Sequence, residues 1–127
     1  HKEILYALDQ GIQVWGCSSM GALRAAECSK FGMKGSGKIF NFFSNTLSTS
    51  DDEVAVSYLS ERPFTEISLP LINLRFAIDS LRNNKIIDDD QSYEIINEIK
   101  SMHFSDRRFD VFYENKKLKP YIDLMKI

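Results

Sequence analysis

Two adjacent serines form the part of this sequence whose residue types and spacing are best suited to chemistry. Ser18 and Ser19 follow the apolar stretch 12–15 and precede a run of helix-favouring residues. A hydroxyl at the start of a helix lies beside unpaired N–H groups and the positive end of the helix dipole. Such a position can hold an anion, or the oxyanion that forms during acyl transfer, without a charged side chain. The serine turn is therefore our first candidate site.

The alternative is that these serines only cap the helix, because a serine oxygen readily accepts a hydrogen bond from an N–H two or three positions on. A nucleophile elbow places glycine two residues before and two residues after its serine. Ser19 has the second glycine, Gly21, but Cys17 occupies the position of the first. The local spacing fits both interpretations, a nucleophile and a cap.

Charged residues around the turn supply further candidates. Arg24 and Glu27 are three residues apart and can meet on one side of the predicted helix. Asp52 and Glu53, with Asp51 before them, precede the apolar run 54–56, which we expect to be a short helix or strand. Acids there would lie at the rim of a pocket and could orient a histidine, bind a cation or repel an anion, although three consecutive acids are more often a solvated turn.

The first half of the chain reads as α/β. We expect a helix over 1–10 that ends at Gly11, a buried strand at Val14 and Trp15, and a second helix from the serines to Gly32. Residues 32–38 have the glycines and lysine of a P-loop, but Ile39 replaces the hydroxyl that would hold magnesium. We interpret 32–38 as a flexible connection to a core segment at 39–43, followed by a polar linker at 45–50.

The second half reads as mainly helical. We expect a helix over 67–81 with Pro70 in its first turn and Arg75 placed to reach a site. Acids 88–90 are predicted to cap a helix over 92–102, and a short helix is predicted over 116–127. The buried stripe of the 92–102 helix is expected to contain Tyr93, Ile95, Ile96 and Ile99. Arg107 and Arg108 suggest an anionic partner, with a solvated pair as the commoner alternative.

Length and composition limit the classes of function. The 127 residues suffice for one domain, which we divide into an α/β part at 1–60 and a mainly helical part at 61–127. A net charge of −2 disfavours general binding to nucleic acid or anionic membranes, and no stretch has the roughly 20 apolar residues that cross a bilayer. The two cysteines are expected to be reduced thiols of a cytoplasmic protein. Cys28 is expected in the core, and Cys17 is a weaker candidate for a reactive group than the two serines. No metal site and no cofactor are expected.

With these residues in hand, the chain resembles the TfuA-like family. The resemblance rests on His1–Leu5, on the run Ser18–Glu27, on Gly32-Met33 followed by Gly35 and Gly37, on 51–56, and on Asn73-Leu74-Arg75. It implies a partial Rossmann-like parallel sheet flanked by helices, with the serine turn at the carboxyl edge of the strands. Family members carry a further strand and an acidic loop before the segment that matches His1–Leu5. Because the chain begins with His1 rather than Met, we expect a fragment or processed form.

The resemblance also implies a role in backbone thioamidation. In these systems a YcaO enzyme uses ATP to activate a peptide amide, and sulfide then replaces the amide oxygen. One activity of the family is hydrolysis of a thiocarboxylated ThiS-like sulfur carrier, which releases sulfide for the YcaO enzyme. That reaction needs an activated nucleophile and an oxyanion hole. We assign these roles on chemical grounds to Ser19 or Ser18 and to the N–H groups of Met20 and Gly21.

The remaining roles follow from the same chemistry. His1 is the best candidate for a general base, because imidazole titrates near neutral pH. Arg24 would bind the anionic thiocarboxylate and Glu27 would orient Arg24 or neutralise it. Two other hypotheses stay open: a non-catalytic adaptor that binds the YcaO enzyme and the sulfur donor, and a fragment without function.

Overall fold

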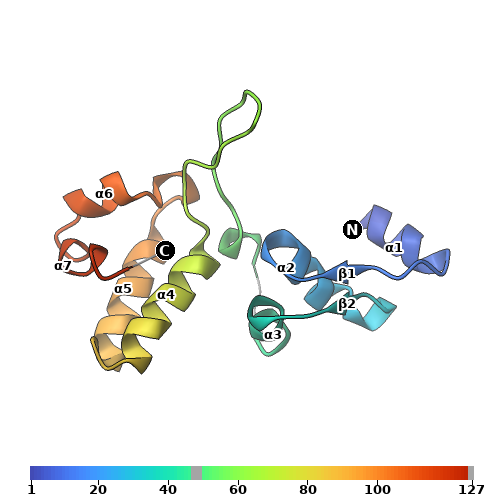
Figure 1. Cartoon of the computed structure of the whole chain (residues 1–127), viewed down its shortest axis with the longest axis horizontal. Helices are drawn as coiled ribbons and strands as arrows, with labels where there is room; N and C mark the ends of the chain where they lie inside the picture. Colours follow the sequence, from blue (N-terminus) through green and yellow to red (C-terminus); the bar gives the residue numbers. More distant parts are fainter. Residues whose placement is uncertain (47–49, 126–127) are drawn as a thin grey trace. The chain divides into compact units, whose positions relative to one another are not determined.

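The structure is a computed structural model that describes residues 1–46 and 50–125, in two compact units, His1–Asp51 and Asp52–Ile127. Part of the predicted linker, residues 47–49, and the last two residues of the predicted final helix lie outside the described residues. The first unit contains α1 (Lys2–Asp9), β1 (Trp15–Gly16), α2 (Ser19–Glu27), η1 (Ser29–Phe31), β2 (Lys34–Gly35) and α3 (Lys38–Ser44) (Figure 1). The short helix η2 (Asp51–Glu53) spans the division, and the second unit contains α4 (Leu71–Asn83), α5 (Asp89–Ser101), η3 (Phe104–Asp106), α6 (Phe109–Glu114) and α7 (Lys119–Ile122).

The two strands of the first unit form a parallel pair. Trp15 is in register with Lys34, and Gly16 with Gly35. Parallel neighbours need a crossover connection, and α2 with η1 supplies it between β1 and β2. The mixed α/β class is confirmed, with most of the described chain helical, while the Rossmann-like arrangement stays a prediction.

Strand β1 and helix α2 approach each other so closely that Gly16 has no room for a side chain. A Cβ built on Gly16 would lie 1.9 Å from the carbonyl oxygen of Gly21 and 3.1 Å from Cβ of Ala25. The backbone of α2 therefore rests directly on β1 just before the serine turn, and this contact fixes where the turn lies. Gly21 has more space, since its own Cβ would meet only Cα of Gly16, at 3.7 Å.

This asymmetry predicts opposite results for two similar substitutions. Gly16→Ala should destabilise the first unit by about 1–3 kcal/mol, because the clash is with backbone and no rotamer relieves it. Gly21→Ala should be neutral or stabilise by up to about 1 kcal/mol, because alanine favours the helix. Urea denaturation followed by fluorescence of Trp15, the single tryptophan, measures both. Equal losses in the two variants would contradict the close packing of α2 on β1.

The core of the first unit is small and lies between the helices and the strand pair. Ala25, Cys28 and Met33 are buried there, and partly buried apolar residues from α1, from the segment before β1 and from α3 pack against them: Ile4, Leu5, Leu8, Val14 and Phe40. The prediction that Cys28 packs as a small apolar residue is confirmed. Cys17 and Cys28 are both free thiols, with Cys17 exposed.

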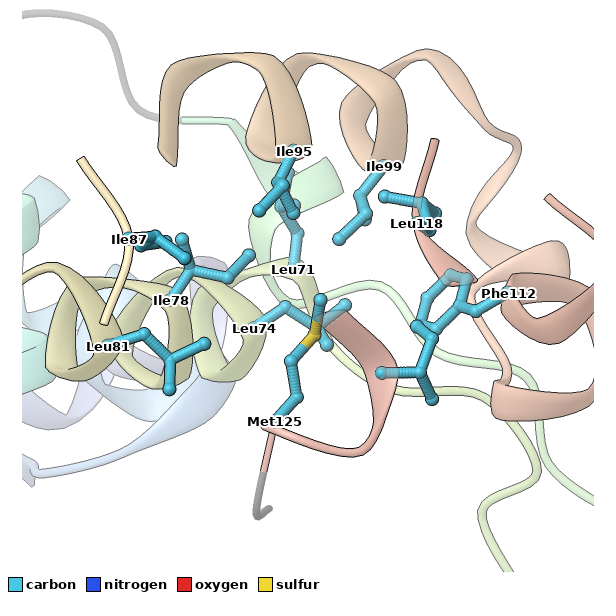
Figure 2. Close-up of a cluster of buried hydrophobic side chains, with 11 residues drawn as sticks. Leu71, Leu74, Ile78, Leu81, Ile87, Ile95, Ile99, Phe112, Leu118 and Met125 are labelled. Carbon is cyan, nitrogen blue, oxygen red and sulfur yellow. The ribbon is translucent and has the colours of Figure 1, made fainter. Parts of the chain in front are cut away.

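The second unit has a larger core, built mainly by α4 and α5 with the C-terminal helices (Figure 2). Its members are Leu71, Leu74, Ile78, Leu81, Ile87, Ile95, Ile99, Phe112, Leu118, Ile122 and Met125. The predicted helix over 67–81 is shifted to Leu71–Asn83, because Pro70 is the extended N-cap residue and lies before the first turn. The predicted acidic cap is confirmed at Asp88, which forms a capping box with Gln91, but Asp89 and Asp90 lie within the first turn of α5, so the helix begins three residues before the predicted 92.

Several other local predictions are wrong, each for a physical reason. Helix α2 ends at Glu27, and Gly32, with φ of 100°, ends η1 instead. The predicted flexible connection contains strand β2, which is too short to show alternation. The run 54–56 is neither helix nor strand. Tyr93 is 73% exposed, because it lies on the solvent side of α5, whereas Ile95 and Ile99 are buried.

Candidate functional site

The serine turn connects the end of β1 to the start of α2 (Figure 1). Ser18 is the N-cap residue of α2, in extended conformation with φ of −152° and ψ of 161°, and its side chain makes no capping hydrogen bond. The prediction of a serine at the N-cap position is confirmed, but the expected side-chain cap is wrong. The hydroxyl of Ser18 is therefore not used in holding the helix together.

Ser19 has an uncommon backbone conformation. Its φ is 49°, in the left-handed region that favours glycine. Strained residues of this kind gather at active sites, and a nucleophile on a sharp turn between a strand and a helix is the known geometry of the nucleophile elbow. Residues 17–20 are exposed, so the Ser19 hydroxyl is accessible.

Backbone N–H groups at the start of α2 are available to an acceptor from outside the helix. The first amide that bonds back along the turn is that of Ala22, which donates to the carbonyl oxygen of Ser18 at 3.0 Å. The N–H groups of Ser19, Met20 and Gly21 come before it and have no acceptor within the helix. A developing oxyanion next to Ser19 would meet these donors and the positive end of the dipole.

A second group of predicted site residues meets around the carboxylate of Glu27. Its Oε2 lies 2.6 Å from Nε2 of His1 and 2.7 Å from Nη1 of Arg24. The same Nη1 donates to Oδ1 of Asp51 at 3.2 Å. We call these four residues the Glu27 network. Its four residues lie in the first unit, and the network joins the N-cap residue of α1 to α2 and to the first residue of η2.

The Glu27 network holds Arg24 firmly in its charged form. The hydrogen bond to Glu27 raises the pKa of Arg24 above its ordinary value, against the opposing effect of burial, and Asp51 adds to the increase. Within the described residues, Nε and Nη2 of Arg24 make no hydrogen bond, so one edge of the guanidinium is available to a substrate anion.

The serine turn and the Glu27 network occupy opposite ends of α2. Ser19 is the first residue of the helix and Glu27 the last, which separates their Cα atoms by about 12 Å along the axis. In the described part of the chain, no hydrogen bond joins Ser18 or Ser19 to His1. The structure therefore brings His1, Arg24 and Glu27 together in one group. The residues of the serine turn form a second group, and within the described residues no hydrogen bond joins the two.

The other predicted residues form ion pairs in the second unit. Glu53 accepts three hydrogen bonds from Arg75, from Nε at 3.0 and 2.8 Å and from Nη2 at 2.8 Å. Asp52 accepts from Nη1 and Nη2 of Arg107 at 3.1 and 2.8 Å. The three consecutive acids thus each contact a different arginine, counting Asp51 with Arg24, because successive side chains of a 3₁₀-helix project about 120° apart.

Arg107 was not among the predicted site residues, and the solvated pair expected for it with Arg108 is wrong. Its side chain is fully buried, and besides Asp52 it donates to the carbonyl oxygens of Ile99, Lys100 and Met102 at the end of α5. The one signal in the sequence is its position shortly after a helix, whose last carbonyls need donors. Asp51 is the second residue missing from the predicted set, since three adjacent acids resemble a solvated turn.

The fold and the turn together define a class: a mixed α/β protein with an accessible serine on a strained turn at the start of a helix. Comparison with known families identifies the chain further. The family model described as "TfuA-like protein" matches residues 1–108, and the chain belongs to this family. A search of the curated proteins found no match. No helix in residues 1–46 and 50–125 is long and apolar enough to span a membrane.

Proposed function

We propose that this protein serves YcaO-dependent backbone thioamidation by hydrolysing the thiocarboxylate of a ThiS-like sulfur carrier, which releases sulfide. Two observations support the proposal. The chain belongs to the TfuA-like family, and the resemblance to that family implies an association with YcaO systems. The observation that carries the chemistry is Ser19, whose exposed hydroxyl lies on a strained turn beside free backbone donors.

The reaction is acyl transfer in two steps. The Oγ of Ser19 attacks the carbonyl carbon of the thiocarboxylate, and a C–O bond forms. The serine proton passes to a base and then to sulfur. The C–S bond breaks, HS⁻ leaves, and the acyl group stays on Ser19 as an ester. Water then hydrolyses the ester to a carboxylate and restores the hydroxyl. Overall, one thiocarboxylate and one water give one carboxylate, one HS⁻ and one proton.

The surrounding groups have defined roles in this proposal. The N–H groups of Met20 and Gly21 hold the oxyanion of the tetrahedral intermediate. The free edge of Arg24 binds the anionic end of the carrier, and His1 is the general base. Ser18 is the alternative nucleophile, one residue earlier on the same turn.

The acids and the arginine of the second unit contribute less directly. Asp52, Glu53 and Arg75 remain predicted substrate-binding residues, although the Glu53–Arg75 pair and the Asp52–Arg107 pair already satisfy much of their hydrogen-bonding capacity. The wider proposal includes a Rossmann-like sheet, a cytoplasmic location, and action without a cofactor or bound metal.

The test is a reaction of the chain with a thiocarboxylated ThiS-like carrier. We expect free sulfide over several turnovers. After rapid acid quenching, we expect an ester of the carrier that maps to the peptide containing Ser19. A folded chain that releases no sulfide would overturn the hydrolase proposal.

An adaptor without catalytic activity is the second candidate, and one observation favours it. The segment 57–67 folds back on itself through a bridge between Tyr58 and Glu66, and it exposes Tyr58, Leu59, Phe64 and Ile67. Exposed apolar residues on an ordered segment are typical of contact surfaces. An adaptor would bind the carrier or the YcaO enzyme in calorimetric titrations while leaving the thiocarboxylate intact.

A further inference from the structure

We propose that Glu27 is the positioning residue of the general base, and that it sets His1 to accept protons at Nδ1. The proposal rests on the proposed hydrolysis and adds the part that the serine turn lacks, a base with a fixed tautomer. It is carried by the contacts of the Glu27 network.

The contact between His1 and Glu27 determines which ring nitrogen is the base. Nε2 lies 2.6 Å from a carboxylate oxygen, which can only accept, so Nε2 carries the proton in the neutral ring. Nδ1 is then the acceptor. His1 is the N-cap residue of α1, but its side chain makes no capping hydrogen bond, so the helix does not occupy Nδ1.

The rest of the network holds Glu27 in place. Its Oε2 accepts from His1 and from Arg24 at nearly equal distances, and Asp51 accepts from the same Nη1 of Arg24. A carboxylate that orients an imidazole, and is itself held by further hydrogen bonds, is the arrangement of a catalytic triad without its nucleophile. Asp51 belongs to the site for this reason.

The proton reaches His1 through water. Because about 12 Å along α2 separates Cα of Ser19 from Cα of Glu27, more than one water lies between them: the Oγ proton passes to the first water of a hydrogen-bonded chain, and the last water of that chain passes a proton to Nδ1. The imidazolium returns a proton by the same route to the departing sulfur. No bond to the protein other than the Ser19 ester forms, and the network ends the cycle in its original state.

The experiment measures tautomer and rate separately in Glu27→Gln, with Glu3→Gln as the matched control on α1. Nitrogen-15 NMR of His1 should show protonated Nε2 and unprotonated Nδ1 in the wild type above neutral pH, and a mixture of both tautomers in Glu27→Gln. Sulfide release should fall by at least about tenfold.

Each outcome has a defined meaning. An unchanged tautomer, or an unchanged rate of sulfide release, in Glu27→Gln overturns the positioning role and leaves the proposed function standing. Absence of sulfide release from the wild type overturns the proposed function, while the NMR result still tests the pairing of His1 with Glu27. If Glu27→Gln does not fold, Asp51→Asn loosens the network without removing Glu27. It should give a smaller admixture of the second tautomer and a smaller fall in sulfide release than Glu27→Gln would, and an unchanged tautomer with an unchanged rate would overturn the proposal.

Discussion

Replacing Ser19 with alanine should reduce sulfide release from a thiocarboxylated carrier by about 1,000-fold or more, because the nucleophile is lost and only oxyanion stabilisation and binding remain. Alanine tolerates the backbone conformation of Ser19 no better and no worse than serine, so folding should be unchanged. Initial rates of sulfide formation, measured colorimetrically at equal concentrations of folded protein, give the ratio.

The neighbouring hydroxyl provides the control. Ser18→Ala should keep the rate within about tenfold of the wild type, since Ser18 makes no capping bond and its loss leaves the donors of α2 in place. If Ser18→Ala is the variant that loses activity, the nucleophile is Ser18. If both variants retain full activity, neither serine is the nucleophile and the adaptor becomes the leading function.

Replacing Arg107 with methionine should destabilise the second unit by about 2–4 kcal/mol, because it removes the buried guanidinium that pairs with Asp52 and donates to the carbonyl oxygens of Lys100 and Met102 at the end of α5. This is a large fraction of the stability of a small domain. Far-ultraviolet circular dichroism during urea denaturation reports on the helices of both units, while Trp15 fluorescence reports on the first unit. A transition that circular dichroism detects and Trp15 does not therefore belongs to the second unit.

Two variants show whether the effect comes from burial and pairing. Arg108→Met removes the neighbouring arginine, which pairs with Asp110 at the surface, and should leave the denaturation midpoint almost unchanged. Asp52→Asn combined with Arg107→Met removes both charges and should recover part of the lost stability. Equal losses for Arg107→Met and Arg108→Met would contradict the structural role of Arg107.

The sequence alone predicts the elements whose signals are local. Helix α1, the serine turn and helices α4 and α5 follow from apolar spacing, from Gly11, and from the acids at 88–90, which form the cap of α5 at Asp88. Boundaries shift where one residue has two possible roles, as with Pro70, which is both a good first-turn residue and a barrier to helix before it. Strand β2 has only two residues and carries no periodic signal.

The contacts that build the site are long-range, and local patterns do not contain them. Arg107 and Arg108 are the same residue type side by side, yet one is fully buried and the other contacts solvent. The difference lies in Asp52, which is 55 positions away in the chain. The pairing of His1 with Glu27 is likewise visible only when α1 and α2 are folded together.

The positive φ of Ser19 implies a compromise between stability and activity. A serine in the left-handed region lowers the stability of the fold by about 1–2 kcal/mol, a cost that glycine does not have because it lacks a Cβ. Ser19→Gly should therefore raise the stability of the first unit while removing its hydroxyl. A chain optimised for stability alone would be expected to carry glycine at this position, and the gain in stability of Ser19→Gly measures what the serine costs the fold.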